Sequence, residues 1–344
     1  MKIKKVEFLL LFLFFAMFLY IQPAFAQKPK LATESFYVPA RDPGIELYVR
    51  NKRPEGTTKF NPEKIVLFVH GATYPAECGF DLSLDGMSWM DYIAQRGYDV
   101  YLMDVRGYGA STRPLEMNRP PAENPPIVNT DVAVKDVGAV VDHILIRRGV
   151  PKVNLIGWSW GTAIMAGYTA QNSSKVERLV LYAPVWLRQT PSLVKGEGAY
   201  RTVNMDAAKK RWLTGVPEEK QKDLIPPGWY EVWAKATIAT DPVGSTQTPP
   251  VVRAPNGVIE DGSKYWSAGN PYYDPARINV PVLLIHAEWD ADTPAYMSQA
   301  LFGKLVSAPL KRYVVIVEGT HTVIMEKNRM QLFREVQLFL DEPK

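Results

Sequence analysis

The stretch V-N-L-I-G-W-S-W-G-T-A-I-M-A-G, residues 153–167, sets one serine between two tryptophans and two glycines. The residues before Gly157 predict a short buried strand, and those after Gly161 predict a helix. Ser159 then lies at the apex of a sharp strand-to-helix turn, where backbone strain is rarely kept unless a side chain must be presented. An ordinary glycine-rich turn can have the same letters, but the flanking strand and helix favour a G-x-S-x-G nucleophile elbow.

Continuous apolar runs recur on both sides of this elbow, and such runs are typical of parallel strands covered by helices on both faces. Two earlier runs, at 35–40 and 45–53, alternate in part and predict a leading antiparallel pair. The sequence therefore predicts an α/β fold with a mostly parallel eight-stranded sheet flanked by helices. The other strands are expected at 64–70, 98–104, 152–157, 177–184, 280–286 and 312–319, and helices at 88–97, 131–149, 162–170, 294–305 and 326–340.

Residues 187–279 interrupt this alternation with about 90 residues that are rich in tryptophan and tyrosine. A loop of that length without secondary structure of its own is uncommon. We therefore expect a cap, or lid, subdomain over the sheet, inserted into a core formed by residues 27–186 and 280–344.

The N-terminus is typical of a secretory signal peptide over residues 1–26. A basic start precedes an apolar run from Phe8 to Ile21, and A-F-A at 24–26 offers a cleavage site after Ala26. The alternative is an uncleaved membrane anchor, but the run of 14 residues is shorter than the ~20 that span a bilayer. We expect a secreted or periplasmic protein without stable membrane insertion after cleavage.

The composition is that of a globular protein, since 47% of the 344 residues are hydrophobic and the formal net charge is only +4. No clustered basic face is visible, so no nucleic-acid partner is expected. The histidines and acids lack the paired spacing of metal ligands, and no glycine loop of the phosphate-cradling kind is present. We therefore expect no metal and no cofactor.

Residues able to activate a serine follow other strands of the predicted sheet, at the edge where chemistry collects in such folds. Asp290 and Asp292 follow the strand at 280–286, and His321 follows the last strand. A serine hydroxyl needs a base to take its proton, and histidine matches neutral pH. A carboxylate then fixes the imidazole tautomer.

With these features the chain resembles the α/β-hydrolase superfamily, and within it the capped serine hydrolases of the proline-iminopeptidase-like and carboxylesterase type. The resemblance spans residues 35–340. It rests on His70-Gly71, D-x-R-G-x-G-x-S from Asp104 to Ser111, G-W-S-W-G around Ser159, D-x-x-x-P from Asp290 to Pro294, and G-x-H from Gly319 to His321.

The resemblance implies that Ser159 is the nucleophile, Asp290 the acid and His321 the base. Asp290 is preferred to Asp292 because a proline stands four residues after it, as in the family pattern. An oxyanion hole needs two N–H donors, one directly after the nucleophile, at Trp160, and one from the loop after an early strand, at Ala72. The loop H-G-A-T-Y-P departs from the glycine-rich forms, and Thr73 is the alternative donor.

The expected activity is hydrolysis of a small-molecule carboxylic ester through an acyl-enzyme intermediate. A serine aminopeptidase is the nearest alternative, although H-G-A-T-Y lacks the H-G-G-P-G form usual in that group. Its substrate amine would need an acid from the cap, for which Glu197, Glu231 and Asp241 are available. An alternative of another class is an inactive secreted binding module on the same fold, against which the complete set of triad residues argues.

Overall fold

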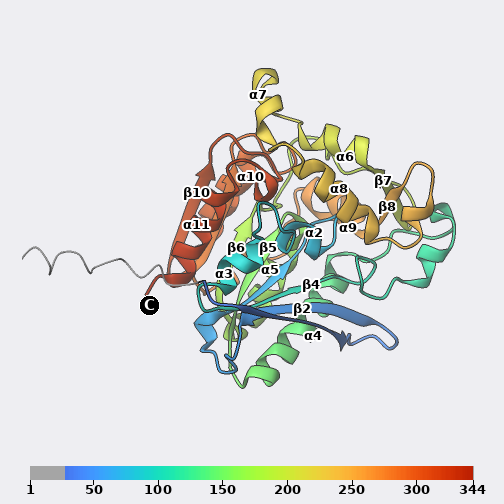
Figure 1. The fold of residues 1–344 in the computed structure, drawn as a ribbon. Coiled ribbons are helices and arrows are strands. Elements are labelled where there is room, and N and C mark those ends of the chain that lie inside the picture. The colour runs from blue at the N-terminus through green and yellow to red at the C-terminus, as the bar shows by residue number, and fades with distance from the viewer. Residues whose placement is uncertain (1–27, 344) are drawn as a thin grey trace, which may run out of the picture. The chain divides into compact units, whose positions relative to one another are not determined.

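The computed structural model describes residues 28–343, so the signal peptide predicted for residues 1–26 lies outside the described residues. An eight-stranded sheet has the strand order β1-β2-β4-β3-β5-β6-β9-β10 (Figure 1). β2 is antiparallel to both its neighbours, and the other neighbouring strands are parallel, which confirms the predicted sheet. The strands are β1 (Leu31–Pro39), β2 (Glu46–Pro54), β3 (Ile65–Val69), β4 (Asp99–Met103), β5 (Val153–Trp158), β6 (Val176–Tyr182), β9 (Val282–Ala287) and β10 (Lys311–Ile316).

Helices connect the parallel strands. The helix α4 (Thr130–Arg148) begins after Asn129, whose side chain accepts a hydrogen bond from the Val132 N–H, and ends at Gly149 in the left-handed conformation. Asparagine at the start and glycine at the end are the residues that such helix ends prefer. None of the helices within residues 28–343 is long and apolar enough to cross a membrane. The other core helices are α2 (Ala76–Phe80), α3 (Trp89–Ala94), α5 (Trp160–Asn172), α10 (Ala295–Lys304) and α11 (Arg329–Asp341).

Alternating side chains of the central strands face two separate hydrophobic cores. In β3, Ile65, Leu67 and Val69 belong to one core, which also contains side chains of α4, α5 and α10. Val66 and Phe68 belong to the other core, which contains side chains of α3 and α11. Every residue of β3 is therefore buried, which explains why this strand is a continuous apolar run in the sequence.

Residues 187–279, called the insert below, have secondary structure of their own. Figure 1 shows its helices and its two-stranded antiparallel sheet grouped on one side of the large sheet. A buried ion pair inside the insert joins Arg253 to Asp241, with 2.8 Å between Nη2 and Oδ1. Arg253 Nη1 also donates to the Met117 carbonyl at 2.7 Å, which fastens the insert to the loop after β4. The insert comprises β7 (Tyr200–Asn204), α6 (Met205–Trp212), α7 (Glu218–Leu224), α8 (Trp229–Ala239), β8 (Val251–Pro255), α9 (Gly257–Asp261) and a π-helical turn, η6 (Gly262–Trp266).

Candidate active site

Ser159 lies at the turn between β5 and α5 with φ 57° and ψ −122°. Such a conformation costs a non-glycine residue about 1–3 kcal/mol. Hydrogen bonds hold the turn in place: the Ser159 N–H donates to the Tyr182 carbonyl at 2.9 Å, and its carbonyl accepts from the Thr162 N–H at 2.8 Å. The turn therefore has the strained geometry that the sequence predicts, and it presents the serine side chain at the carboxyl end of β5.

Two glycines allow the backbone to fold this tightly. A Cβ on Gly157 would lie 2.3 Å from the carbonyl oxygen of Gly161. A Cβ on Gly161 would in turn lie 2.5 Å from the carbonyl oxygen of Val69, at the end of β3. Any larger residue at either position would push α5 away from the sheet and move Ser159 with it.

The imidazole of His321 lies beside the carboxylate of Asp290, with 2.8 Å between Nδ1 and Oδ2. Thr293 fixes this carboxylate, because its N–H donates to Oδ1 and its hydroxyl to Oδ2, each at 2.8 Å. His321 and Ser159 line the same cavity. The three residues proposed from the sequence as acid, base and nucleophile therefore lie in one place.

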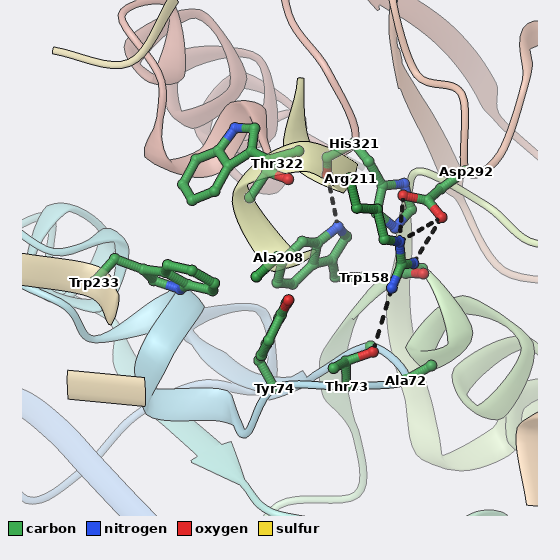
Figure 2. Close-up of a pocket in the computed structure, with 13 residues that line it drawn as sticks. Ala72, Thr73, Tyr74, Trp158, Ala208, Arg211, Trp233, Asp292, His321 and Thr322 are labelled. Carbon is green, nitrogen blue, oxygen red and sulfur yellow. Dashed lines mark hydrogen bonds and ion pairs between the residues drawn. The ribbon is translucent and has the colours of Figure 1, made fainter. Parts of the chain in front are cut away.

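Asp292 has a different partner from Asp290. Arg211 of α6 binds its carboxylate, with Nη2 2.6 Å from Oδ1, as Figure 2 shows. Burial raises the pKa of the Asp292 carboxyl, but the positive charges of Arg211 and His321 more than offset this, so the net shift is downward. Asp292 is therefore an anion beside the imidazole without touching it.

The pKa of His321 reflects these two carboxylates. Burial lowers the pKa of the imidazole, whereas the negative charges of Asp290 and Asp292 raise it by more in sum. The net pKa lies above the ordinary value of 6.5. The surroundings therefore stabilise the imidazolium, which is the form that a general base takes after it accepts a proton.

The main-chain carbonyl of His321 accepts hydrogen bonds from two aromatic side chains. The Trp158 Nε1–H donates to the His321 carbonyl at 3.0 Å, and the Tyr182 hydroxyl donates to the same oxygen at 2.7 Å. The two rings stack with centroids 5.8 Å apart. The first tryptophan of the elbow motif thus anchors the histidine loop (Figure 2). The second, Trp160, donates its Nε1–H to the Thr130 hydroxyl at 2.8 Å, at the start of α4.

The loop after β3 carries both main-chain donors considered for the oxyanion hole, Ala72 and Thr73. The Ala72 carbonyl accepts from the Tyr108 hydroxyl at 2.9 Å and also from the guanidinium of Arg201, in β7. We find no hydrogen bond from the N–H groups of Ala72, Thr73 or Trp160 among the described residues. All three line a cavity at Ser159, so Ala72 and Thr73 both stay candidates for the second donor.

Two cavities meet at Ser159, with Arg211 and Asp292 in the walls of both. The first contains ≈ 480 Å³ of space, part of it open to solvent, and the second ≈ 610 Å³ on the same measure. Aromatic side chains from the core and the insert line the first cavity, several of them visible in Figure 2: Tyr74, Trp158, Trp212 and Trp233. The second cavity is bounded by the start of the insert, by α9 and by η6.

A buried carboxyl group, Glu326, joins the histidine loop to the insert. It accepts hydrogen bonds from the N–H and hydroxyl of Thr320, next to His321, and from the Trp212 Nε1–H of α6 at 2.7 Å. Burial raises the pKa of Glu326 to about 7 despite these donors. Glu326 thus links Trp212, in the wall of the first cavity, to the loop that carries His321.

Cys78 and Arg106 line neither of the cavities at Ser159. Burial raises the pKa of the Cys78 thiol to about 12, so this cysteine is protonated at neutral pH. Arg106, which stands in the D-x-R-G motif, is bound by Asp136, with 3.0 Å between Nε and Oδ1, and lines neither cavity. Within residues 28–343 no three histidine, cysteine or acidic side chains gather closely enough to hold a metal ion.

Sequence reasoning missed most of the side chains that support the site. The contact of Thr293 with Asp290 has a partial signal in the sequence, because aspartate side chains often accept hydrogen bonds from main-chain N–H groups that closely follow them in turns. No local pattern in the sequence indicates the other supporting residues, because each contacts a residue far away in the chain: Tyr182, Arg201, Arg211 and Glu326. Only the packing of the insert and the histidine loop against the sheet brings these residues together.

The chain matches known proteins over part of its length. The family described as alpha/beta hydrolase fold matches residues 64–328. Among curated proteins, a stretch of 155 residues, 44% of this chain, is 27% identical to the multifunctional-autoprocessing repeats-in-toxin protein of Vibrio vulnificus. That match covers only 2% of the toxin's length, so it concerns one small part of a much larger protein.

Solved structures with the same fold include known hydrolases. A serine hydrolase from Cycloclasticus zankles, a bacterium that degrades polyaromatic hydrocarbons, superposes with a TM-score of 0.60 and 15% identity over 90% of this chain and 98% of that one. A thermophilic esterase from Thermogutta terrifontis gives a TM-score of 0.57 and 16% identity over 89% and 98%. At such low sequence identity these similarities show a shared fold and do not show a shared substrate.

Proposed function

The chain belongs to the alpha/beta hydrolase family, and from that premise we propose that it is a serine hydrolase that cleaves small carboxylic esters through an acyl-enzyme intermediate. The single observation that carries the proposal is the cluster at the strand ends. Ser159 stands on a strained elbow, in a cavity shared with His321, whose Nδ1 lies 2.8 Å from the Asp290 carboxylate.

The proposed roles follow from these contacts. Asp290 holds the Nδ1–H tautomer of His321, which leaves Nε2 free to accept the proton of the Ser159 hydroxyl. The serine oxygen then attacks the ester carbonyl, and the protonated imidazole returns the proton to the departing alcohol. Water repeats the sequence on the acyl-enzyme and releases the carboxylic acid.

The oxyanion of each tetrahedral intermediate would be bound by the N–H of Trp160 and one N–H of the loop after β3. Donors that are already fixed in place stabilise such charge strongly, because they need no reorganisation as it forms. The Ala72 carbonyl accepts hydrogen bonds from Tyr108 and Arg201. These contacts fix the position of the loop, which supports its N–H groups as donors that are already in place.

An ester substrate is favoured over an aminoacyl amide by the charges around Ser159. A free amine needs an acid within reach, yet Glu197, Glu231 and Asp241 line neither cavity. Asp241 is paired with Arg253 instead. Asp292 does line both cavities, but Arg211 already binds its carboxylate.

The ester itself is expected to be short or aromatic. The first cavity is walled by tryptophan and tyrosine rings, with Tyr74 and Trp233 in edge contact at 4.9 Å between centroids. Flat apolar walls around a small space suit an aromatic or short acyl group better than a long alkyl chain. We therefore expect kcat/KM to be higher for butyrate and benzoate esters than for palmitate esters or a prolyl amide.

The measurement is a set of p-nitrophenyl esters and prolyl p-nitroanilide, assayed on the protein lacking residues 1–26. A preference for palmitate would contradict the small pocket. A preference for the prolyl amide would identify an aminopeptidase in place of an esterase. If a serine-directed probe labels the protein but none of these compounds is turned over, the proposed substrate class is wrong.

The pH dependence should report His321. The base works only as neutral imidazole, so kcat/KM should fall as the pH drops through its pKa, with an inflection above 6.5. Asp292→Asn should move this inflection to lower pH, because it removes a carboxylate that stabilises the imidazolium and leaves Arg211 uncompensated. An inflection at or below 6.5, or one that Asp292→Asn does not move, would contradict this electrostatic account.

A further inference from the structure

The second cavity at Ser159 is lined by Arg188, a cation that makes no ion pair with an acidic side chain among residues 28–343. Arg188, near the start of the insert, lines this cavity together with Ser159 and Trp266. Its backbone N–H donates to the Trp266 carbonyl at 2.8 Å, and its Nη2 donates to the Asp292 carbonyl at 2.7 Å. Arg188 is therefore held at its backbone and at one guanidinium nitrogen, in the wall of a cavity that Ser159 also lines.

The other terminal nitrogen of Arg188, Nη1, is buried and has no hydrogen-bond partner among residues 28–343. The carboxylate of Asp292 does not serve it, because both its oxygens face Arg211 and only the main-chain oxygen of Asp292 accepts from Arg188. Buried donors are almost always satisfied in folded proteins, and an unsatisfied one attached to a charge is especially costly. Arg188 is a lining residue of the second cavity, so a small shift of its side chain would let an acceptor bound there reach Nη1 and remove this cost.

The charges select the kind of acceptor. Arg211 is paired with the Asp292 carboxylate, whereas the guanidinium of Arg188 makes no ion pair with a carboxylate among residues 28–343 and feels Asp290 and Asp292 only through space. A carboxylate matches that single charge and accepts hydrogen bonds from guanidinium N–H groups in good geometry. A phosphate dianion would bring a second negative charge close to Asp290 and Asp292, which is unfavourable in a partly buried site.

Resting on the ester hydrolysis proposed above, we infer that the substrate carries a free carboxylate, which Arg188 binds in the second cavity while the ester carbonyl lies at Ser159. The apolar walls of that cavity, with Val185, Val258 and Ile259, take the chain between the two groups. The protein is thus a hydrolase of half-esters or of other esters that bear an acid group.

The test compares matched pairs of esters that differ only in charge. Monoethyl glutarate is paired with ethyl glutaramate, which has an amide in place of the acid, and 4-acetoxybutanoate with 4-acetoxybutanamide. In the wild-type protein, kcat/KM should favour the acid in at least one pair. In Arg188→Met, which keeps the apolar stem, that ratio should fall about 100-fold, and Arg188→Lys should restore part of it.

Arg312→Met is the matched control. Arg312 of β10 also has a buried Nη1 that finds no hydrogen-bond partner in the described part of the chain, but it lines neither cavity, so its loss should leave the ratio unchanged. Equal loss on acid and amide in Arg188→Met would show that Arg188 serves only the structure of the loop. A wild-type ratio near one would mean that water, and not substrate, satisfies Nη1.

The two proposals fail in different ways. If the neutral esters are cleaved and the acids are not preferred, the proposed esterase activity is supported and the proposed carboxylate site is wrong. If no ester is cleaved, the hydrolase proposal fails, and calorimetry with glutarate decides the site separately. Binding that Arg188→Met weakens at least tenfold would support the site, and absent or unchanged binding would overturn it.

Discussion

Ester hydrolysis is expected to disappear when Ser159 is replaced by alanine, with a loss in kcat of at least about 10⁴-fold. The hydroxyl, the imidazole and the carboxylate act as one unit, so removing the nucleophile leaves His321 and Asp290 with nothing to activate. Labelling by a fluorophosphonate probe should vanish with the activity. The measurements are kcat with the best ester of the panel and the mass of the protein after treatment with the probe.

Cys78→Ala is the matched control for this experiment. Cys78 is the only thiol in the chain, and burial keeps it protonated with a pKa of about 12. Its replacement should leave probe labelling intact. Labelling that survives Ser159→Ala and is lost in Cys78→Ala would move the nucleophile to the cysteine.

Asp290→Asn should be almost as damaging, with kcat lower by about 10⁴-fold. The Thr293 N–H donates to Oδ1 of Asp290, and only an oxygen can accept there, so the new amide would place its oxygen at that position. Its NH₂ group would then stand where Oδ2 now meets Nδ1 of His321. The imidazole would have to accept at Nδ1 and carry its proton on Nε2, a tautomer that cannot act as base toward Ser159.

Asp292→Asn gives the comparison. It removes the ion pair with Arg211 and the negative charge near His321, but it leaves the imidazole tautomer untouched. The loss in kcat should therefore be far smaller than for Asp290→Asn, measured on the same ester with both variants checked for an unchanged melting temperature. The reverse order would assign the acid role to Asp292.

The fold could be predicted because its signals are local. The central parallel strands are covered on both faces, as β3 is, so they appear in the sequence as largely apolar runs, whereas the edge strand β10 is only partly buried. The elbow is local as well, since the glycines that permit it stand two residues on either side of Ser159. The juxtaposition of Asp290 and His321 follows from topology, because β9 and β10 are parallel neighbours whose carboxyl ends meet at one edge.

The surroundings of the site could not be predicted in this way. The carbonyl of His321 is held by Trp158, 163 residues earlier in the chain, and no periodicity links the two. Arg201 reaches the Ala72 loop from the insert, whose path over the sheet depends on its own packing and not on any repeat in the sequence. The lack of a hydrogen-bond partner for Nη1 of Arg188 among the described residues is harder still to predict, because it depends on which oxygens of Asp292 accept from Arg211 and which from Arg188.

Adjacent side chains on α6 limit how this protein can diverge during evolution. Arg211 reaches Asp292 and Trp212 reaches Glu326, so one helix end meets two separate loops. Because a helix turns about 100° per residue, deleting a single residue upstream in α6 would swing both side chains off their partners at once. We therefore expect new substrate preferences to arise by point substitution on α6, for example at Ala208, and changes of chain length to be tolerated in exposed segments such as 246–250.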